Sequence, residues 1–469
     1  MVIESLKYKI LQQFGFAPTQ EQGQALDTFV SFLTDRDPQS VMILRGSAGT
    51  GKTSLSGAIV RTLLQIRQKV MLLAPTGRAA KVFSLGSGAP AYTIHRRIYR
   101  EKAFAGVDGQ FSLNDNLYTD TLFMVDEASM IANMGLGGTT FGSGCLLDDL
   151  VKFVYQGHND RLLLIGDKAQ LPPVGEEESP ALSASVMEGY GLKVYECDLN
   201  EVLRQSQSSG ILYNATLIRQ MITHDAVTGL PLIRFKGFAD IVMMPGAELV
   251  ESLGDSYHHV GMDETMVITR SNKRANIYNN GIRNMVLDRE EELSSGDMLM
   301  IVKNNYFWTE KEKKESGEGS AGAVPAFLAN GDRAKVLRVS NYIELYGFRF
   351  ATLLLQLPDY DDYEMQVTGM LDTLQSEAPA LTHEQQEELF RQVEEDYQHF
   401  VPLKADRMKS IRQDAYFNAL QIKYAYAVTC HKAQGGQWAH VYVDQGYMAD
   451  DMLTPDYIHW LYTAFTRAT

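Results

Sequence analysis

The sequence contains little cysteine and no long apolar segment. Its three cysteines, Cys145, Cys197 and Cys430, lie far apart and form no Cys-x-x-Cys pair, which argues against a disulfide framework and against a zinc site. No stretch reaches the roughly 18 consecutive apolar residues that a membrane-spanning helix needs, and the first residues do not follow the pattern of a targeting signal. We therefore expect a soluble, cytoplasmic protein that does not enter a membrane.

Positive charge is also scarce. The chain has 43 Lys and Arg against 58 Asp and Glu, a net charge of −15. Nucleic-acid-binding proteins usually carry at least one basic face, so this balance lowers the expectation of a DNA partner. It does not exclude one, because a large motor needs positive charge only in its binding groove and must release phosphates as readily as it binds them.

The rest of the composition is that of an ordinary folded protein. Apolar residues make up 45% of the chain and charged residues 22%, which excludes a disordered or collagen-like chain. A length of 469 residues exceeds what one hydrophobic core usually serves, so we expect two or more domains with a binding crevice between them.

Short apolar runs that end in small or acidic residues recur between Ser40 and Asn200. Each is separated from the next by enough chain for a helix or a longer crossover, which is typical of a doubly wound parallel sheet. The predicted strands are Val41–Leu44, Val70–Ala74, Thr121–Val125, Arg161–Ile165 and Val194–Cys197. Ligands of such sheets bind at the carboxyl ends of the strands.

The second half of the chain predicts another sheet, interrupted by an insertion. Its strands are Thr265–Thr269, Met298–Val302 and His440–Val443. The insertion contains an exposed loop at 310–322, the strands Asp332–Val339 and Phe348–Leu357, and an acidic helix at 383–398. We thus predict a first domain of residues 1–205, a second of 206–302 with 420–469, and an inserted module of 303–419; Gly135–Gly144 is interpreted as a glycine-rich linker.

A phosphate-binding loop follows the first predicted strand and opens a helix. The segment reads Gly46-Ser47-Ala48-Gly49-Thr50-Gly51-Lys52-Thr53, which has the P-loop spacing and its strand–loop–helix context. Glycines let backbone N–H groups turn toward the phosphates, Lys52 reaches the β- and γ-phosphate oxygens, and Thr53 is a ligand of Mg²⁺. The sequence therefore predicts ATP and Mg²⁺ as cofactors.

Two adjacent carboxylates, Asp126 and Glu127, end another strand at the same edge of the sheet. Such pairs also serve as helix caps, but in a chain with a preceding P-loop they predict a catalytic role. Asp126 would hold hydrated Mg²⁺, and Glu127 would act as the general base that polarises the attacking water.

The remaining motifs resemble those of superfamily 1 helicases, in particular RecD-like members of the 5′→3′ group with a UvrD-type C-terminal domain. The resemblance runs from Thr19 to Arg467. It rests on Thr19-Gln20-Glu21-Gln22, Ala74-Pro75-Thr76-Gly77-Arg78, Thr93-Ile94-His95, Gly166-Asp167-Lys168-Ala169-Gln170-Leu171-Pro172-Pro173, Leu199–Gln205, Ala427–Gly436 and Leu461–Ala468.

The resemblance implies further residues at the nucleotide. Gln22 would read the adenine, with Gln20 or Gln24 as alternatives, and Gln170 would sense the γ-phosphate. Arg204 and Arg467 would act as arginine fingers from the second domain. Their attraction to the γ-phosphate would hold the crevice closed, and the crevice would open when the phosphate is released. Gly435 would complete the nucleotide site.

It also implies a path for DNA. The residues expected to contact it are Thr76, Arg78, His95, Thr429, His431 and Lys432, although a core or capping role for His95 stays open. For Arg270 and Lys273, a place at the solvated start of a helix and a contact with DNA or nucleotide are both open. The inserted module would be SH3-like, opening at Asn330-Gly331-Asp332, and residues 96–120 would form a strand-splitting pin with Phe104 or Phe111 as its wedge.

The expected architecture is α/β, with two RecA-like P-loop domains of parallel strands and small inserted subdomains. The resemblance implies a monomeric ATP-dependent DNA helicase that moves 5′→3′ on single-stranded DNA or a tailed duplex, with replication or recombination proteins as possible partners. The alternatives are an RNA-directed helicase of the same superfamily and a nucleotide-switch accessory subunit of a recombination complex. In the family another strand normally follows the motif of Arg467 and closes the second sheet, so without it we expect lower stability and weaker unwinding.

Overall fold

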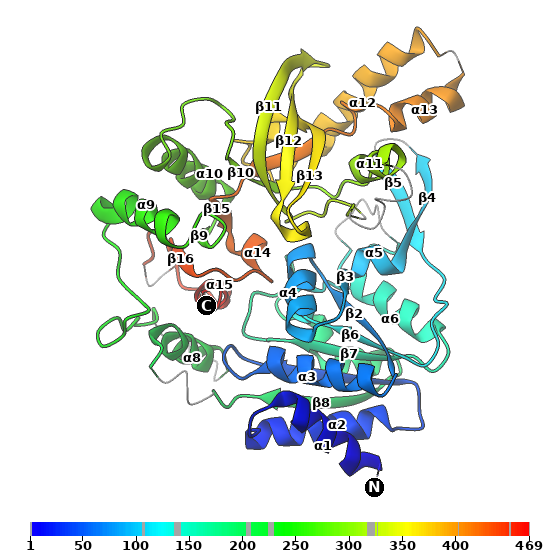
Figure 1. Cartoon of the computed structure of the whole chain (residues 1–469), viewed down its shortest axis with the longest axis vertical. Coiled ribbons are helices and arrows are strands. Elements are labelled where there is room, and N and C mark those ends of the chain that lie inside the picture. The colour runs from blue at the N-terminus through cyan, green and yellow to red at the C-terminus, as the bar shows by residue number, and fades with distance from the viewer. Residues whose placement is uncertain are drawn as a thin grey trace.

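The computed structural model describes residues 2–105, 108–135, 142–202, 208–223, 229–316, 324–325, 327–401, 403–449 and 452–468, with side chains from residue 4 onward and outside 101–110. Its helices and strands form a parallel α/β sheet, a β-barrel and a second, smaller parallel sheet (Figure 1). The predicted α/β class with parallel sheets is confirmed.

The first half of the chain is built on a six-stranded sheet with the order β3-β2-β6-β7-β1-β8. Every neighbouring pair is parallel. The strands are β1 (Ser40–Gly46), β2 (Lys69–Ala74), β3 (Ala91–Thr93), β6 (Thr121–Val125), β7 (Arg161–Gly166) and β8 (Lys193–Leu199). All five strands predicted for this region are therefore present, and the short β3 is added at one edge.

Helices cover both faces of this sheet because alternate residues of each strand point to opposite sides. Met42 and Leu44 pack into one core, whereas Val41 and Ile43 pack into the other. The first core contains α1 (Val2–Phe14), α2 (Gln20–Leu33), α3 (Lys52–Gln65) and part of α4 (Gly77–Ser87); the second contains α5 (Ile94–Ile98), α6 (Leu146–Gln156) and α7 (Ala184–Gly189). Helices on two faces leave the carboxyl edge of the strands free to carry a site.

The predicted pin region forms a two-stranded antiparallel hairpin of β4 (Tyr99–Ala105) and β5 (Asp108–Leu113). The ring of Phe111 lies 5.0 Å from that of Tyr306 and packs against the first domain's core. The side chain of Phe104 lies outside the described residues. Of the two proposed wedges, Phe111 is thus engaged in packing at the base of the hairpin.

The second sheet has three strands, the number predicted, but Ala427–Thr429 forms one of them in place of Met298–Val302. It contains β9 (Thr265–Thr269) between β15 (Ala427–Thr429) and β16 (His440–Val443), all parallel. The helices of this half are α8 (Gly210–Thr223), α9 (Leu249–His259), α10 (Asn272–Gly281), α14 (Cys430–Ala433) and α15 (Pro455–Phe465).

The assignment of Met298–Val302 to this second sheet was wrong. The strand β10 (Met298–Ile301) instead joins a closed barrel with β11 (Arg333–Leu345), β12 (Phe348–Leu357), β13 (Tyr363–Met370) and β14 (Leu420–Tyr424). Every residue of β10 is buried, and a uniformly buried run fits a barrel strand as well as a central parallel strand.

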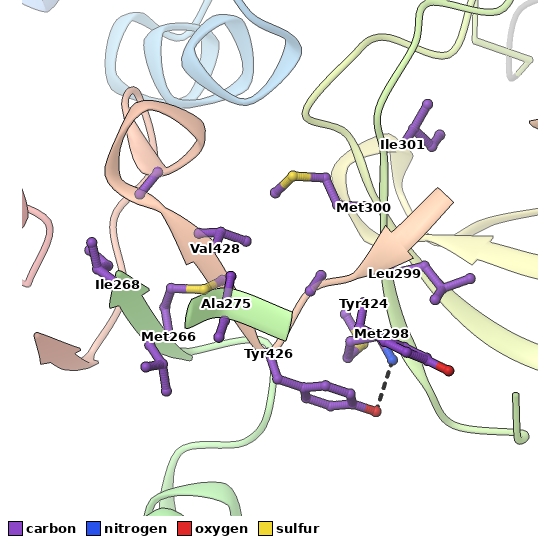
Figure 2. Packing of buried hydrophobic residues seen from close by; sticks show 14 of the residues in the cluster. Met266, Ile268, Ala275, Met298, Leu299, Met300, Ile301, Tyr424, Tyr426 and Val428 are labelled. Carbon is purple, nitrogen blue, oxygen red and sulfur yellow. Dashed lines mark hydrogen bonds between the residues drawn. The ribbon is translucent and has the colours of Figure 1, made fainter. Parts of the chain in front are cut away.

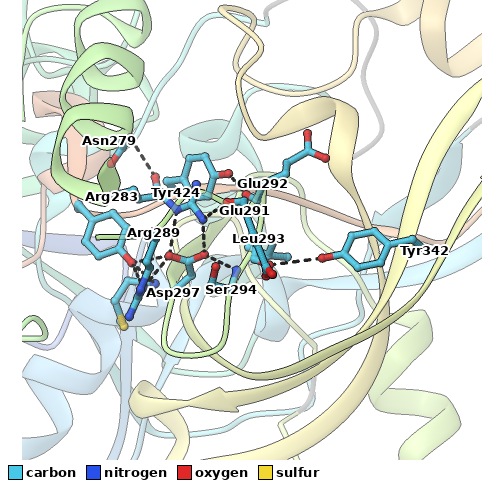
Figure 3. A network of polar contacts seen from close by, with 12 residues as sticks. Asn279, Arg283, Arg289, Glu291, Glu292, Leu293, Ser294, Asp297, Tyr342 and Tyr424 are labelled. Atoms are coloured by element: carbon cyan, nitrogen blue, oxygen red, sulfur yellow. Dashed lines mark hydrogen bonds and ion pairs between the residues drawn. The ribbon is translucent and has the colours of Figure 1, made fainter. Parts of the chain in front are cut away.

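The barrel and the second sheet share one continuous core. Figure 2 shows Met266 and Ile268 of the sheet on one side of Tyr426, and Met298 and Tyr424 of the barrel on the other. A buried network reinforces the junction (Figure 3): Asp297 accepts hydrogen bonds from Arg283 at 3.1 Å, Arg289 at 2.7 Å and the Tyr426 hydroxyl at 2.8 Å. Because a buried carboxylate is stable only when it is paired and hydrogen-bonded, this network holds the barrel firmly on the second sheet.

The loop predicted at 310–322 is wrong for residues 310–316, and residues 317–322 lie outside the described part of the chain. Residues 310–316 belong to the helix α11 (Phe307–Ser316), since Lys and Glu are good helix formers and Glu310 and Lys314 lie four residues apart. The predicted acidic helix is confirmed as α12 (His383–Gln398), followed by α13 (Lys404–Arg412). Its Leu389 and Val393 pack against the end of the barrel.

Where the structure is described, no helix combines the length and the apolar character that a membrane span requires.

Candidate nucleotide site and inter-domain contacts

The phosphate-binding loop lies where the motif predicts, between the end of β1 and the start of α3. Gly49 and Gly51 adopt positive φ angles of 76° and 79°, which glycine reaches at no steric cost. Lys52 Nζ donates to the carbonyl oxygens of Gly46 and, at 3.0 Å, Ser47. The lysine therefore lies folded over the loop that it would serve.

Gln22 lies behind this loop and is almost fully buried, at 1% exposure. Its amide nitrogen donates to the carbonyl oxygen of Thr50 at 2.9 Å. Its amide oxygen accepts from the backbone N–H of Thr19, while the Thr19 hydroxyl accepts from the N–H of Gln22. Gln22 thus completes a capping box at the start of α2 and supports the phosphate-binding loop. The sequence analysis predicts only adenine reading for Gln22, so this structural role is an addition.

Asp126 and Glu127 follow β6 at the same edge of the sheet. Burial, and then the charge of Glu127, raises the pKa of Asp126 to about 7. Glu127, the second residue after the strand, takes a left-handed conformation with φ of 51°, a conformation that costs energy for a residue with a side chain. A partly buried pair of adjacent carboxylates favours a cation beside it, which fits the donor set predicted for Mg²⁺.

A chain of polar contacts joins Glu127 to the last motif. In the amide orientation that gives both atoms a partner, Gln170 donates to Glu127 Oε2 at 3.3 Å and accepts from Arg467 Nη2 at 3.2 Å. Arg467 Nη1 lies 4.0 Å from Glu127 Oε1, and its guanidinium is also held by the carbonyl oxygens of Thr463 and Gly436. Three of the predicted catalytic residues therefore meet, although they come from β6, the end of β7 and the segment after α15.

Helix α15 also binds the phosphate-binding loop directly. The Tyr462 hydroxyl accepts from the N–H of Ala48 at 3.0 Å and donates to Asp167 Oδ2 at 2.6 Å. Both Tyr462 and Asp167 are buried, and burial raises the pKa of the Tyr462 hydroxyl well above its usual range. Further contacts hold the helix against the Gly166–Leu171 segment: the Thr463 hydroxyl accepts from Leu171 N at 2.8 Å, and His459 Nδ1 lies 2.9 Å from the carbonyl oxygen of Ala169.

The predicted DNA contact Arg78 lies in a second inter-domain contact. Its guanidinium lies 4.5 Å from the centre of the Trp438 ring and donates to the carbonyl oxygen of Gln437 at 2.8 Å. Asp359, at the turn after β12, lies 3.8 Å from Arg78 and 3.9 Å from Lys81. Burial lowers the pKa of Arg78 to about 10, so this arginine is enclosed by protein groups.

Helix α4 begins against the barrel, directly below the turn that joins β12 and β13 (Figure 1). A Cβ atom at Gly77 would lie 2.4 Å from Asp332 Oδ1, so only glycine allows this approach. Asp332 accepts from the Tyr360 hydroxyl at 2.6 Å through Oδ2, and burial raises its pKa to about 7. The Asn330-Gly331-Asp332 element therefore supports the contact between the barrel and the first domain.

The other predicted DNA-contacting residues are distributed over both domains. Thr76 caps α4 by accepting from Ala79 N at 3.2 Å, and burial lowers the pKa of His95 to about 4, so its imidazole is neutral at pH 7. On the second domain Thr429 precedes α14, His431 is exposed, and burial lowers the pKa of Lys432 to about 8.

Two further residues were predicted at the nucleotide. Arg204 lies outside the described residues. The atoms nearest to a Cβ at Gly435 belong to Thr76, the cap of α4, and to Ala79 in its first turn. Gly435 therefore packs on the first predicted DNA-contacting motif, and its role at the nucleotide stays a prediction.

Several residues that build these contacts were not predicted from the sequence: Tyr462, Thr463, His459, Trp438 and Asp359. Tyr462, Thr463 and Trp438 lie in or beside recognised motifs, but nothing in the sequence indicated their partners on the first domain.

Comparisons with known proteins agree with these motifs. Residues 17–229 match the AAA domain family, and residues 424–469 match the UvrD-like helicase C-terminal domain family. The ATP-dependent RecD2 DNA helicase of Deinococcus radiodurans is 30% identical over 157 residues, which cover 33% of this chain and 18% of that protein. The ATP-dependent DNA helicase dda of Enterobacteria phage T4 is 25% identical over 267 residues, 55% of either chain.

The chain thus spans about half or less of the length of these two curated relatives. A solved structure, that of a Pif1 helicase from Bacteroides in complex with ADP-AlF3 and ssDNA, aligns over 97% of this chain and 90% of that one, with 13% identity and a TM-score of 0.46. The sequence matches confirm the predicted resemblance to superfamily 1 helicases of the RecD type.

Proposed function

We propose that this chain, which is similar to superfamily 1 helicases of the RecD type, is an ATP-dependent DNA helicase that moves along single-stranded DNA. The observation that carries the proposal is the contact of Glu127, Gln170 and Arg467. It joins the predicted general base of one domain to a cation of the other, next to a phosphate-binding loop.

The chemistry follows from these positions. The N–H groups of the loop and Lys52 would bind the phosphates, and Thr53 with Asp126 would hold Mg²⁺, which neutralises charge that develops on the transferred phosphoryl group. Glu127 would orient and polarise the attacking water. Arg467 would stabilise the charge of the transition state from the far domain, with Arg204 as the second finger.

Gln170 would couple hydrolysis to movement. Its amide lies between Glu127 and Arg467, so a change in the charge at the terminal phosphate alters its hydrogen bonds on both sides. Helix α15, which precedes Arg467, bonds to the phosphate-binding loop through Tyr462. A coupling device needs two discrete arrangements that a ligand can bias, and contact or separation of α15 and the loop would supply them.

For the DNA we propose a path across the two α/β domains beneath the barrel, which would be the SH3-like module. Thr76 and His95 on the first domain and Thr429, His431 and Lys432 on the second would contact the strand. Hydroxyls, neutral imidazole and backbone groups bind phosphates and base faces without reading sequence. The 5′→3′ direction, residues 96–120 as a strand-splitting pin and the domain limits are proposed from the family resemblance.

A tailed-duplex assay tests this function. With ATP and Mg²⁺ present, we expect unwinding of a duplex that carries a 5′ single-stranded DNA tail and little unwinding of one with a 3′ tail. Equal unwinding of both would contradict the polarity, and unwinding of neither would contradict the helicase proposal. The RNA-directed alternative predicts instead that matched RNA tails and RNA oligonucleotides are preferred in unwinding and in ATPase stimulation.

A further inference from the structure

We infer that Arg219 is an additional phosphate-binding residue of the nucleotide site, and that with ATP bound its guanidinium contacts the terminal phosphate. The inference rests on the proposed ATPase function and adds a cation to it. Arg219 lies on α8, in the segment that follows the first sheet.

Arg219 contacts the phosphate-binding loop at Ser47, the second residue of the loop. Its Nη1 donates to the hydroxyl of Ser47 at 2.6 Å and to Asn200 Oδ1 at 3.3 Å. Ser47 is buried, at 6% exposure, and the N–H of the next residue, Ala48, is bound by Tyr462. Two neighbouring loop residues are therefore contacted by α8 and α15, the helices that pack against each other.

Arg219 differs from other arginines of the described chain in the kind of group that it binds. Arg45 lies 2.6 Å from Asp198 and 2.8 Å from Glu196, and Arg274 lies 2.6 Å from Asp444. Among the residues that the structure describes, no carboxylate lies within 4.0 Å of the Arg219 guanidinium. A guanidinium bound to neutral oxygens at a phosphate-binding loop retains donors and full charge for an anion.

The terminal phosphate is the part of ATP that this position favours. Lys52 lies folded on the carbonyl oxygens of Gly46 and Ser47, and Arg219 reaches the same Ser47 from the side of the second domain. A charge-assisted hydrogen bond from guanidinium to phosphate is stronger than the neutral bond to the Ser47 hydroxyl. Binding of the triphosphate would therefore draw Arg219 from the hydroxyl onto the phosphate.

A structural role is the competing explanation: Arg219 would act only by holding Ser47 in place. The two roles separate in a comparison of Arg219→Gln, Ser47→Ala and the double variant. All three are placed in a Glu127→Gln background, so that ATP is bound without turnover, and the dissociation constants of ATP and ADP are measured with Mg²⁺.

If Arg219 binds the terminal phosphate, Arg219→Gln weakens ATP binding by about tenfold and changes ADP binding by less than about twofold. Ser47→Ala changes both by less than about twofold. The inference is overturned if Arg219→Gln weakens ATP and ADP equally, or if Ser47→Ala reproduces its effect and the double variant adds nothing.

Two controls keep the test decisive. Arg219→Lys preserves one charge without the planar group, and it should fall between wild type and Arg219→Gln; it also replaces the glutamine variant if that one fails to fold. Absence of ATP binding by the parent Glu127→Gln protein, together with absence of hydrolysis by wild type, would refute the ATPase proposal itself. Normal binding by the parent with no loss in the Arg219 variants would refute this inference alone.

Discussion

Replacing Tyr462 with phenylalanine tests whether docking of α15 on the phosphate-binding loop controls turnover. The substitution keeps the ring in its buried position and removes only the hydroxyl. It would leave two polar groups without a partner: the N–H of Ala48, which is partly buried, and Oδ2 of Asp167, which is 3% exposed.

The magnitude follows from these two contacts. Leaving a buried polar group without its partner costs about 1–3 kcal/mol. Taking about 2 kcal/mol for the loss, the docked arrangement becomes roughly 30-fold less populated relative to the undocked one. Because Arg467 follows α15 and lies near Glu127 in this docked arrangement, undocking should remove it from the site, and kcat should fall by up to the same roughly 30-fold factor.

The assay is steady-state ATP hydrolysis at saturating ATP, with Tyr457→Phe as the matched control. Tyr457 lies on the same helix and is also buried, but its hydroxyl donates to Gln445 within the second domain at 3.3 Å. A Tyr462→Phe variant with wild-type kcat, or a Tyr457→Phe variant with the same loss, would refute the argument that this hydroxyl couples the domains.

Three further outcomes are expected. Arg467→Lys should lower kcat by about 10³-fold or more while ATP affinity changes much less, and a parallel loss of both in kinetic and binding measurements would assign the residue to ground-state binding. Burial raises the pKa of Asp332 from 3.8 to about 7, so the folded state gains stability from the protonated carboxyl below about pH 4 and loses it as the pH rises to about 7. Asp332→Asn should therefore flatten the dependence of Tm on pH between about pH 4 and pH 7. An unchanged profile would exclude the Asp332 carboxyl as the cause of that dependence. Asp359→Asn removes the acidic partner of Arg78 and Lys81, so single-stranded DNA should bind more tightly at low salt with a steeper salt dependence, and weaker binding in a titration would show that the contact positions the DNA groups.

The strands of the first sheet and the site they carry could be predicted because their signals are local. Each strand is a short buried run, and the P-loop and the Asp126-Glu127 pair directly follow such runs. Parallel strands bring their carboxyl ends to one edge, so placing these motifs at strand ends was enough to bring them together.

Pairings between distant segments could not be predicted in the same way. The burial of Met298–Ile301 gives no indication of whether its partners are β9 or β11, and the contact of Ala48 with Tyr462 joins residues 414 positions apart. One missed feature did have a local signal. Thr19 and Gln22 have the spacing of a capping box, which we had interpreted only as an adenine-reading motif.

Gly77 and Arg78 have contacts with the barrel that could not be predicted from their own motif. Their motif predicts a DNA contact, which stays a prediction. The structure adds that they also meet the barrel, through the close approach of Gly77 to Asp332 and the pairing of Arg78 with Asp359. An inter-domain contact of this kind depends on the relative position of two separately folded regions, which the pattern of one segment does not encode.

If the proposed function is correct, single-stranded DNA stimulates ATP hydrolysis at the Glu127 site, so the first measurement is the steady-state rate of ATP hydrolysis with and without single-stranded DNA. Glu127→Gln serves as the blank, because it removes the general base while preserving the size of the side chain. We predict strong stimulation of the wild-type rate by single-stranded DNA and no turnover by Glu127→Gln in either condition. A wild-type rate that is indifferent to DNA, or a Glu127→Gln rate equal to that of wild type, would contradict the account.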